Sequence, residues 1–154
     1  MKIAYLIQCH LDPQHNARLV NKLTNDTSNH AFIHVDLKVD IKPFIDALND
    51  CDSVTFLKDR MIVHWGGYSS VKATLALMES ALKYGNFDRF VFLQGLEYPI
   101  KSNKEIDAFF SDHSETEFIL AKNISSSNEF AECHKHRLYY SFDNIDKFYY
   151  KILH

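Results

Sequence analysis

Lys2-Ile3-Ala4-Tyr5-Leu6-Ile7-Gln8 is a nearly continuous apolar run, and it predicts a first strand that is covered on both faces of a sheet. Asp12-Pro13 follows, with an Asp placed to cap a helix and a Pro suited to its first turn. Strands and helices then alternate: strands are expected at 2–8, 30–35, 54–57, 87–94 and 117–120, and helices at 14–24, 43–48, 69–84 and 103–110. This order predicts an α/β, Rossmann-like fold with a mostly parallel sheet and helices on both faces.

Apolar residues at helical spacing predict which side of the longest helix is buried. Ser69 or Ser70 is placed to cap this helix. The predicted buried stripe consists of Val71, Leu75, Met78 and Leu82, widened by Leu77 and Ala81. Further along, Ser102-Asn103-Lys104-Glu105 has the spacing of a capping box and is expected to open the helix at 103–110.

Composition limits the classes of protein that the chain can represent. Its 154 residues, 46% of them apolar, suffice for one globular core. The net charge is -3 and Lys and Arg form no cluster, which argues against a nucleic-acid partner. No apolar run approaches the roughly 20 residues that cross a bilayer, and residues 1–7 favour a first strand over a signal peptide. Three widely spaced cysteines favour free thiols in a reducing compartment, so we expect a soluble, cytoplasmic domain.

Two regions are expected along the chain. Residues 1–122 hold the alternating elements and are predicted to form the α/β domain. Residues 123–154 begin with a polar, Ser-rich loop and end with apolar residues at helical spacing: Phe142, Ile145, Phe148, Tyr149 and Ile152. Because an amphipathic helical tail usually packs against something, our hypothesis is that the chain is the N-terminal portion of a longer polypeptide.

Polar side chains follow three of the expected strands, in Gln8-Cys9-His10, His34-Val35-Asp36 and Gln94-Gly95-Leu96-Glu97. The carboxyl ends of parallel strands meet at one edge of a sheet, where open α/β sheets bind ligands. We therefore expect a nucleotide site at this edge. The chain has neither G-x-G-x-x-G after the first strand nor a G-x-x-x-x-G-K-[ST] loop, which argues against a dehydrogenase or a kinase.

Several residues near this edge suit a nucleotide. Asp36 can hydrogen-bond a ribose or a base edge, and Trp65 can stack on a base. The alternatives are that Asp36 caps the next segment and that Trp65 is a core aromatic residue. His10 is expected to touch the ligand or to form an ordinary loop hydrogen bond. Arg60 is expected to bind a phosphate or to anchor the Trp65-Gly66-Gly67 loop through carbonyl groups.

Several motifs in one order resemble those of a known family: Ile33-His34-Val35-Asp36; Arg60 with Val63-His64-Trp65-Gly66-Gly67 and Ser69-Ser70-Val71-Lys72-Ala73; and Gly95-Leu96-Glu97-Tyr98-Pro99-Ile100-Lys101-Ser102. Over residues 2–120 the chain resembles the core-2/I-branching β-1,6-N-acetylglucosaminyltransferases, a family similar in turn to peptide O-xylosyltransferases. The resemblance implies a GT-A type fold, a UDP-sugar donor and transfer of a sugar, GlcNAc being expected, to a glycan hydroxyl with inversion.

The resemblance also implies site residues. Asp36 and the aromatic residue of the W-G-G turn, here Trp65 with Gly66, are expected to contact the nucleotide, together with His10 and Arg60. Glu97 stands where the family usually has Asp, and it is expected at the donor site or in a structural pair with Lys101. Arg137 is the candidate for acceptor binding. The resemblance places the catalytic Glu in a C-terminal half, so the general base is expected beyond His154.

No cofactor and no metal are expected. The resemblance implies that basic side chains neutralise the leaving diphosphate. Lys or Arg can replace a divalent cation there because the departing oxygen needs only compensation of its negative charge. Asp50-Cys51-Asp52 matches a metal-binding D-x-D turn but precedes the third strand, so a solvated turn is expected. The segment with Cys133, His134 and His136 lacks the spacing of a closed zinc site.

Other functions stay open. A nucleotidyltransferase would use the same strand ends but needs a pair of metal-binding carboxylates near Glu97. A non-catalytic or incomplete nucleotide-sugar-binding module is the alternative from another class, because the expected base is missing. The first interpretation predicts a UDP-sugar donor and a glycan or glycolipid acceptor in surface polysaccharide assembly, with peripheral contact at the inner face of the membrane.

Overall fold

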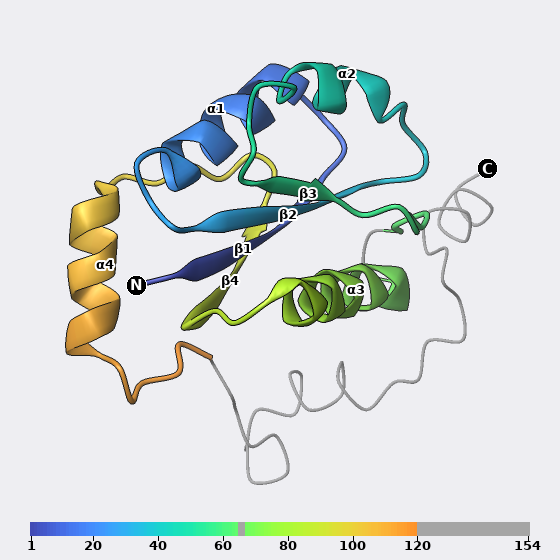
Figure 1. Ribbon diagram of the computed structural model, residues 1–154. Coiled ribbons are helices and arrows are strands. Elements are labelled where there is room, and N and C mark those ends of the chain that lie inside the picture. Colours follow the sequence, from blue (N-terminus) through green and yellow to red (C-terminus); the bar gives the residue numbers. More distant parts are fainter. Residues whose placement is uncertain (65–66, 120–154) are drawn as a thin grey trace, which may run out of the picture.

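The sheet at the centre of the molecule has four parallel strands in the order β3-β2-β1-β4 (Figure 1). The computed structural model describes residues 1–64 and 67–119. In chain order its elements are β1 (Ile3–Cys9), α1 (Pro13–Thr24), β2 (His30–Val35), α2 (Lys42–Asp46), β3 (Val54–Phe56), α3 (Tyr68–Tyr84), β4 (Arg89–Gln94) and α4 (Asn103–Asp112).

The strand order reverses between β1 and β4. From β1 the chain adds β2 and then β3 on one side, and it then crosses over through α3 to place β4 on the other side of β1. In open parallel sheets, the crevice at such a reversal lies outside the carboxyl ends of the two strands and holds the ligand. The topology therefore marks the ends of β1 and β4 as the place to look for a site.

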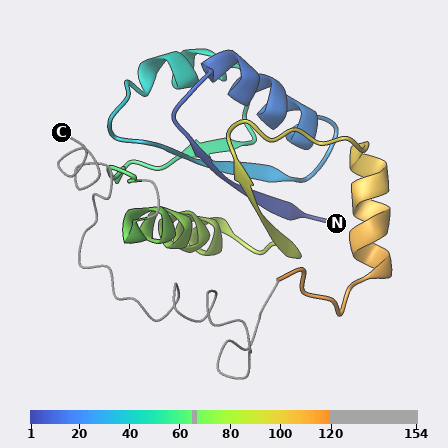
Figure 2. The same ribbon diagram turned by 180° about the vertical axis from the view of Figure 1, so that it is seen from behind.

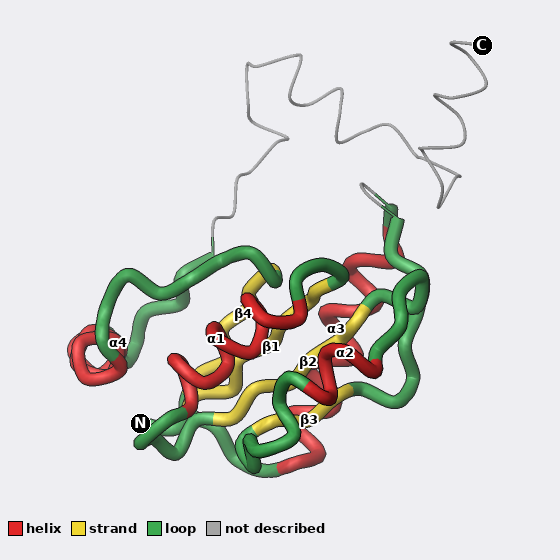
Figure 3. Tube along the Cα trace, turned by 90° about the horizontal axis from the view of Figure 1, so that it is seen from above, coloured by secondary structure: helices red, strands yellow, loops and turns green. Residues whose placement is uncertain are grey.

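Helices cover both faces of the sheet, as expected. α1 and α2 lie on one face and α3 on the other, which the reverse view shows again (Figures 1 and 2). Seen from above, α1 and α2 lie over the strands, and α4 stands to the side (Figure 3). The cluster beneath α1 and α2 includes Ile3, Tyr5, Ile7, Leu19, Val20, Leu23, Ile33 and Phe44. The cluster beneath α3 contains Ala4, Leu6, Phe32, Leu57, Leu77 and Ala81.

The buried strands confirm the prediction from apolar runs. All residues of β2, and all of β1 except Gln8, are buried, as in a strand with helices on both faces. β4 alternates between half-buried and exposed residues. Phe90 and Phe92, which lie on the α3 face, are 38% and 41% exposed. The α/β fold class, GT-A-like with a parallel sheet, is confirmed.

Two predicted helix starts are also confirmed. The Asp12 carboxylate accepts a hydrogen bond from the His15 N–H at 2.9 Å, and Pro13 opens α1. At α4, the Ser102 hydroxyl accepts from the Glu105 N–H while the Glu105 carboxylate accepts from the Ser102 N–H. These hydrogen bonds satisfy N–H groups that a helix leaves unpaired at its start.

The predicted buried side of α3 is only partly right, because Leu77 and Ala81, which were expected to widen the buried stripe, are buried, but the stripe itself is not. Its members Val71, Leu75, Met78 and Leu82 are exposed, whereas the buried residues are Ser69, Ala73, Leu77 and Ala81. The alanines present little bulk, so α3 packs close to β1 and β2 along this side. The predicted cap is also wrong, because Gly67 occupies the N-cap position with no side-chain hydrogen bond. The Ser69 hydroxyl instead accepts from the His64 N–H at 2.9 Å.

Two strand predictions need correction. Residues 117–119 form no strand, and β4 begins at Arg89 rather than at residue 87. The Arg89 guanidinium donates to the carbonyl groups of His113, Ser114 and Thr116, which fixes the irregular segment that leads from α4 to residues 117–119. Apolar composition alone does not distinguish such a segment from a short strand.

The ends of β1 and β4 approach each other closely at Gly95. A Cβ at this position would lie 2.5 Å from the Cβ and 3.2 Å from the Cα of Cys9. The Gly95 N–H also donates to the Gln8 carbonyl at 2.8 Å. A glycine is therefore required at the end of β4, beside the strand reversal.

Candidate functional site

A cavity of about 580 Å³ lies outside the carboxyl ends of β1, β2 and β4, at the strand reversal. It is lined by Gln8, Cys9, His10, Leu11, His34, Asp36, Lys38, Val63, His64, Gly67, Ser70, Gln94, Gly95 and Leu96. Its volume is in the range of small-molecule sites. Of the predicted donor residues, His10 and Asp36 line this cavity, which we call the edge cavity.

Asp36 follows the last residue of β2 and connects two parts of the wall of the edge cavity, Cys9 and Lys38. Its N–H donates to the Cys9 carbonyl at 2.9 Å, which joins the end of β2 to the end of β1. Its carboxylate accepts from the Lys38 N–H at 2.9 Å in an Asx-type turn and forms an ion pair with the Lys38 ammonium at 3.3 Å. The residue is only 5% exposed. A carboxylate has about four acceptor positions, so acceptor capacity is left beyond these two partners.

Lys38 places a cation at the edge cavity. Its ammonium is held by Asp36 and by the Val63 carbonyl, to which it donates at 2.7 Å, and its side chain is half exposed. An ammonium held in this way can meet a phosphate from the solvent side. The sequence prediction missed Lys38; the available signal was a lysine two residues after a strand-end aspartate.

His34, on β2, pairs with Gln8 on the neighbouring strand β1 and is fully buried. The Met61 N–H lies 3.1 Å from its Nε2, which must accept, so the neutral ring carries its proton on Nδ1. Burial chiefly lowers the pKa of His34 from its usual 6.5, with Arg60 adding to the effect and Asp36 opposing it. The ring is therefore neutral near pH 7 and fixes the loop that contains Met61.

The start of α3 closes another wall of the edge cavity. The Gln8 amide donates to the Ser70 carbonyl at 2.8 Å and to the Thr74 hydroxyl at 2.7 Å. The Ser70 hydroxyl donates back to the Gln8 amide oxygen at 3.2 Å. This network ties the first turns of α3 to the end of β1, with Gly67 and Ser70 lining the cavity. The N-terminal end of a helix carries partial positive charge and favours anions.

The comparison with known proteins identifies the family. The family model described as Core-2/I-Branching enzyme matches residues 3–148 of the chain. The chain belongs to the Core-2/I-Branching enzyme family. The family predicted from the motifs is thereby confirmed.

The chain is also similar to curated xylosyltransferases. Human xylosyltransferase 2 is 24% identical over 148 residues, which cover 94% of this chain and 17% of the human protein. Rat xylosyltransferase 1 is 24% identical over 123 residues, covering 77% of this chain and 15% of the rat protein. A xylosyltransferase of Ciona intestinalis is 20% identical over 148 residues, covering 88% of this chain and 18% of that protein. The chain thus spans less than a fifth of the length of these relatives.

Two of the residues implied by the family motifs have structural partners in this Core-2/I-Branching chain. The Arg60 guanidinium donates to the carbonyl groups of Asp36 and Val39 at 3.3 and 3.1 Å, so it anchors the loop after β2. The Glu97 carboxylate accepts from the Gln94 N–H at 2.7 Å and closes the turn after β4. Neither side chain lines the edge cavity. Glu97 lies one residue beyond Leu96, on the wall of a second cavity.

The predicted pair between Lys101 and Glu97 is wrong. Lys101, just before α4, instead forms an ion pair at 3.2 Å with Glu105 in the first turn of that helix. Because Glu105 is already held by Ser102 in the capping box, it is the better placed carboxylate.

Some predicted residues lie outside the described part of the chain. They are the donor candidates Trp65 and Gly66, the acceptor candidate Arg137, the segment with Cys133, His134 and His136, and the whole tail at 123–154 with its predicted helical spacing. Their roles stay predictions.

Among residues 1–64 and 67–119, no group of three or more His, Cys, Asp or Glu side chains could hold a metal ion. Asp50 and Asp52 precede β3, at the amino edge of the sheet and away from the edge cavity. Burial raises the pKa of the Cys9 thiol to about 12, so Cys9 is a protonated packing residue. None of the described helices is long and apolar enough to cross a bilayer.

Proposed function

We propose that this chain is the donor-binding portion of a glycosyltransferase that transfers a sugar from a UDP-sugar to a glycan hydroxyl with inversion. The observation that carries the proposal is the edge cavity at the strand reversal, with the Asp36 carboxylate and the Lys38 ammonium on its wall. Membership of the Core-2/I-Branching family supports it.

The nucleoside is assigned to the Asp36 side of the edge cavity. The Asp36 carboxylate retains acceptor capacity, and a ribose hydroxyl or a uracil N–H is a matching donor. Its backbone is fixed by Cys9 and its loop by Arg60, so the carboxylate is held in place before the ligand arrives. Preorganisation of this kind reduces the entropy cost of binding. Trp65 remains the proposed stacking partner of the base.

The diphosphate is assigned to Lys38 and the start of α3. Lys38 carries a full positive charge, and Gly67 with Ser70 brings the helix N-terminus to the same cavity. Both features stabilise negative charge on a leaving diphosphate. Donor binding without a divalent cation follows from this arrangement, and a chelator tests it.

The acceptor hydroxyl must lose a proton during inverting transfer, which requires a general base. Asp36 is paired with Lys38, and the Glu97 carboxylate is bonded to the Gln94 N–H, so both are already engaged. We propose that the base lies outside the described residues 1–64 and 67–119, as the family motifs imply. The second candidate function, a nucleotide-sugar-binding module without turnover, is favoured for the isolated chain by the same observation.

The donor sugar is proposed to be N-acetylglucosamine, and xylose is the competing choice because the relatives in the comparison are named xylosyltransferases. The acceptor is proposed to be a glycan or glycolipid of a surface polysaccharide, met in the cytoplasm at the inner face of the membrane, with Arg137 contributing to its binding.

Calorimetric titration tests the proposal. UDP, UDP-GlcNAc, UDP-xylose and GDP-mannose are titrated into the chain with Mn²⁺ and with EDTA. We expect UDP compounds to bind equally under both conditions and GDP-mannose to bind at least tenfold more weakly. Binding only with Mn²⁺ would favour the nucleotidyltransferase, and no binding of any UDP compound would refute the proposal.

Variants of Asp36 locate the binding site. Asp36→Asn keeps the side-chain shape and removes the charge, and we expect about tenfold weaker UDP binding. Asp46→Asn, on the exposed side of α2, is the matched control and should bind as the wild type does. Circular dichroism confirms that both variants are folded. Unchanged affinity in a folded Asp36→Asn variant would reject the assignment.

A further inference from the structure

The exposed side of α3 carries a regular line of five apolar residues, which we call the α3 seam: Tyr68, Val71, Leu75, Met78 and Leu82. These side chains are between 37% and 66% exposed. They are spaced by three, four, three and four residues, a seven-residue repeat by which one helix packs along another. The side of α3 that meets the sheet consists of other residues. A continuous apolar line on a surface marks a contact with another element.

A second segment of the chain has the matching pattern. Residues 138–152 lie outside the described part of the structure, and the apolar residues in their sequence include Leu138, Phe142, Ile145, Tyr149 and Ile152. Their spacing is four, three, four and three residues, which is the spacing of the α3 seam read in the opposite direction. Two helices with these spacings match at all five positions only when they run antiparallel.

The described chain ends near the end of α3 at which an antiparallel segment would begin. The Glu117 carboxylate forms an ion pair at 3.5 Å with the guanidinium of Arg89, the first residue of β4. Only residues 85–88 separate the end of α3 from β4, and Figures 1 and 2 show the described chain stopping beside the start of β4. An extended chain covers roughly 3.3 Å per residue, so residues 120–137 are long enough for the second segment to reach Leu82.

We propose that residues 138–152 form a helix that docks antiparallel on the α3 seam. Leu138 then lies against Leu82, and Ile145 lies against Leu75 at the middle of the contact. The contact takes apolar side chains of both segments out of water, which stabilises the folded chain. A second copy of the chain is the competing occupant of the seam, because the same two patterns can pair between molecules.

Antiparallel docking returns the chain to the edge of the sheet that holds the edge cavity. It brings Ile152 to Tyr68, at the start of α3. Gly67 and Ser70, on the two sides of Tyr68 in the sequence, line the edge cavity. The docked segment therefore ends beside the proposed donor site, although the contact itself does not depend on donor binding.

Nuclear Overhauser spectroscopy on the full chain, with ¹³C-labelled methyl groups, tests the contact directly. We expect cross-peaks from the Met78 methyl to the Phe142 ring and from the Val71 methyls to the Tyr149 ring. Absence of cross-peaks between the two segments would overturn the proposal, and cross-peaks from Val71 to Phe142 would overturn the antiparallel direction. Light scattering should find a monomer; a dimer that Leu75→Lys dissociates would assign the seam to a second copy instead.

A double-mutant cycle measured by urea denaturation tests the energetics of the contact. We expect Leu75→Ala and Ile145→Ala each to raise the unfolding equilibrium constant about tenfold. The double variant should also show about a tenfold rise, because both substitutions remove the same contact. If the two effects multiply instead, the proposal is overturned.

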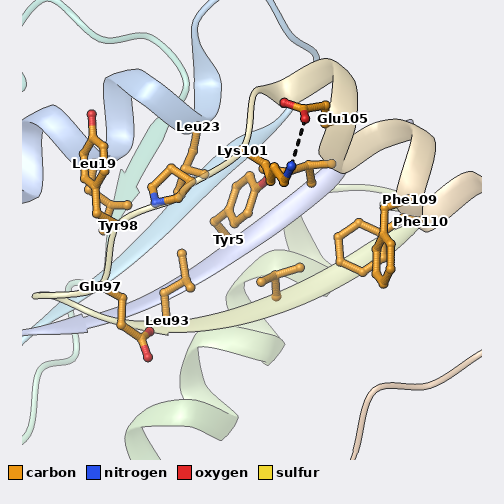
Figure 4. A pocket seen from close by; sticks show the side chains of 13 residues that line it. Tyr5, Leu19, Leu23, Leu93, Glu97, Tyr98, Lys101, Glu105, Phe109 and Phe110 are labelled. Atoms are coloured by element: carbon orange, nitrogen blue, oxygen red, sulfur yellow. Dashed lines mark hydrogen bonds and ion pairs between the residues drawn. The ribbon is translucent and has the colours of Figure 1, made fainter.

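Phe109→Ala provides the matched control for the cycle. Phe109 lies on α4 at the wall of the second cavity, between α1, α4 and the strands β1 and β4 (Figure 4). Its side chain is 47% exposed, within the range of the α3 seam. We expect the effects of Phe109→Ala and Ile145→Ala on the unfolding equilibrium constant to multiply, as they do for residues that are not in contact. Coupling of Ile145 to Phe109 rather than to Leu75 would contradict docking on the α3 seam.

Discussion

Gly95 at the end of β4 lies against Cys9 at the end of β1, so closely that an added Cβ would come within 2.5 Å of the Cys9 Cβ. This contact holds the two strands together where their order reverses and where the edge cavity opens. Both residues line that cavity, so the packing of the strand ends and the shape of the proposed site depend on the same contact.

Gly95→Ala is therefore expected to destabilise the fold. A methyl group forced into a packed position costs typically 1–3 kcal/mol, and we expect a loss of about 2 kcal/mol in the free energy of unfolding. Gly85→Ala is the control, because among the described residues an added Cβ there comes within 4 Å only of the flexible end of Lys2, at 4.0 Å. Urea denaturation of both variants provides the measurement. Equal stabilities for the two variants would show that the contact at Gly95 is not tight.

Stability should fall as the pH is lowered through the range in which histidine titrates. Burial lowers the pKa of His34, and that of His30, from the usual 6.5 in the folded chain. As the pH falls below 6.5, the unfolded chain binds protons that the folded chain does not, which favours unfolding until the folded pKa values are reached.

Urea denaturation at pH 7.5 and at pH 5.5 measures this effect. The wild type should have a lower free energy of unfolding at pH 5.5 than at pH 7.5. For His34→Gln, the decrease between the two pH values should be smaller than for the wild type. A wild type that is more stable at pH 5.5 would contradict the burial of neutral His34 and His30.

The capping box should contribute measurably to the stability of α4. Ser102→Ala removes the hydroxyl that accepts from the Glu105 N–H, and losing an N-cap of this kind costs about 1 kcal/mol. Ser111→Ala, on the exposed last turn of the same helix, serves as the control and should change stability little. Thermal unfolding followed by circular dichroism compares the two variants. A larger effect at Ser111 would disagree with the observed cap.

Lys38→Met should weaken binding of UDP more than binding of uridine. The substitution keeps the length of the side chain but removes the charge assigned to the diphosphate. A hydrogen bond to a charged group contributes about 1.5–3 kcal/mol, so we expect at least a tenfold loss for UDP. Lys42→Met, exposed at the start of α2, is the control. If calorimetry finds that the variant loses equal affinity for UDP and for uridine, the assignment of Lys38 to the diphosphate is wrong.

The four strands of the sheet and the first helix could be predicted because their signals are local and strong. The β1 run is buried on both faces, and Asp12-Pro13 caps α1 through bonds that lie within four residues. The buried side of α3 could be predicted only in part, at Leu77 and Ala81, because that helix is apolar on more than one side. Close packing of Ala73 and Ala81 against the sheet decided between the sides, and packing is a tertiary effect.

The candidate site shows the same division. His10 and Asp36 could be placed at one edge because parallel strands end together. The roles of Lys38 and His34 could not be predicted, because they depend on contacts with a distant loop. The Val63 carbonyl accepts from the Lys38 ammonium, and the Met61 N–H donates to the His34 ring. Glu97 looked available from its motif, but its carboxylate turns back to the Gln94 N–H, and only the turn geometry reveals this.

Chemical-shift mapping of UDP on the ¹⁵N-labelled chain, in the presence of EDTA, tests the nucleotide site most directly. We predict that the amide signals that shift belong to the ends of β1, β2 and β4 and to the start of α3, with Asp36, Lys38 and Gly95 among them. Shifts confined to the amino edge of the sheet around Asp50 and Asp52, or no shifts at all with saturating UDP, would contradict the account.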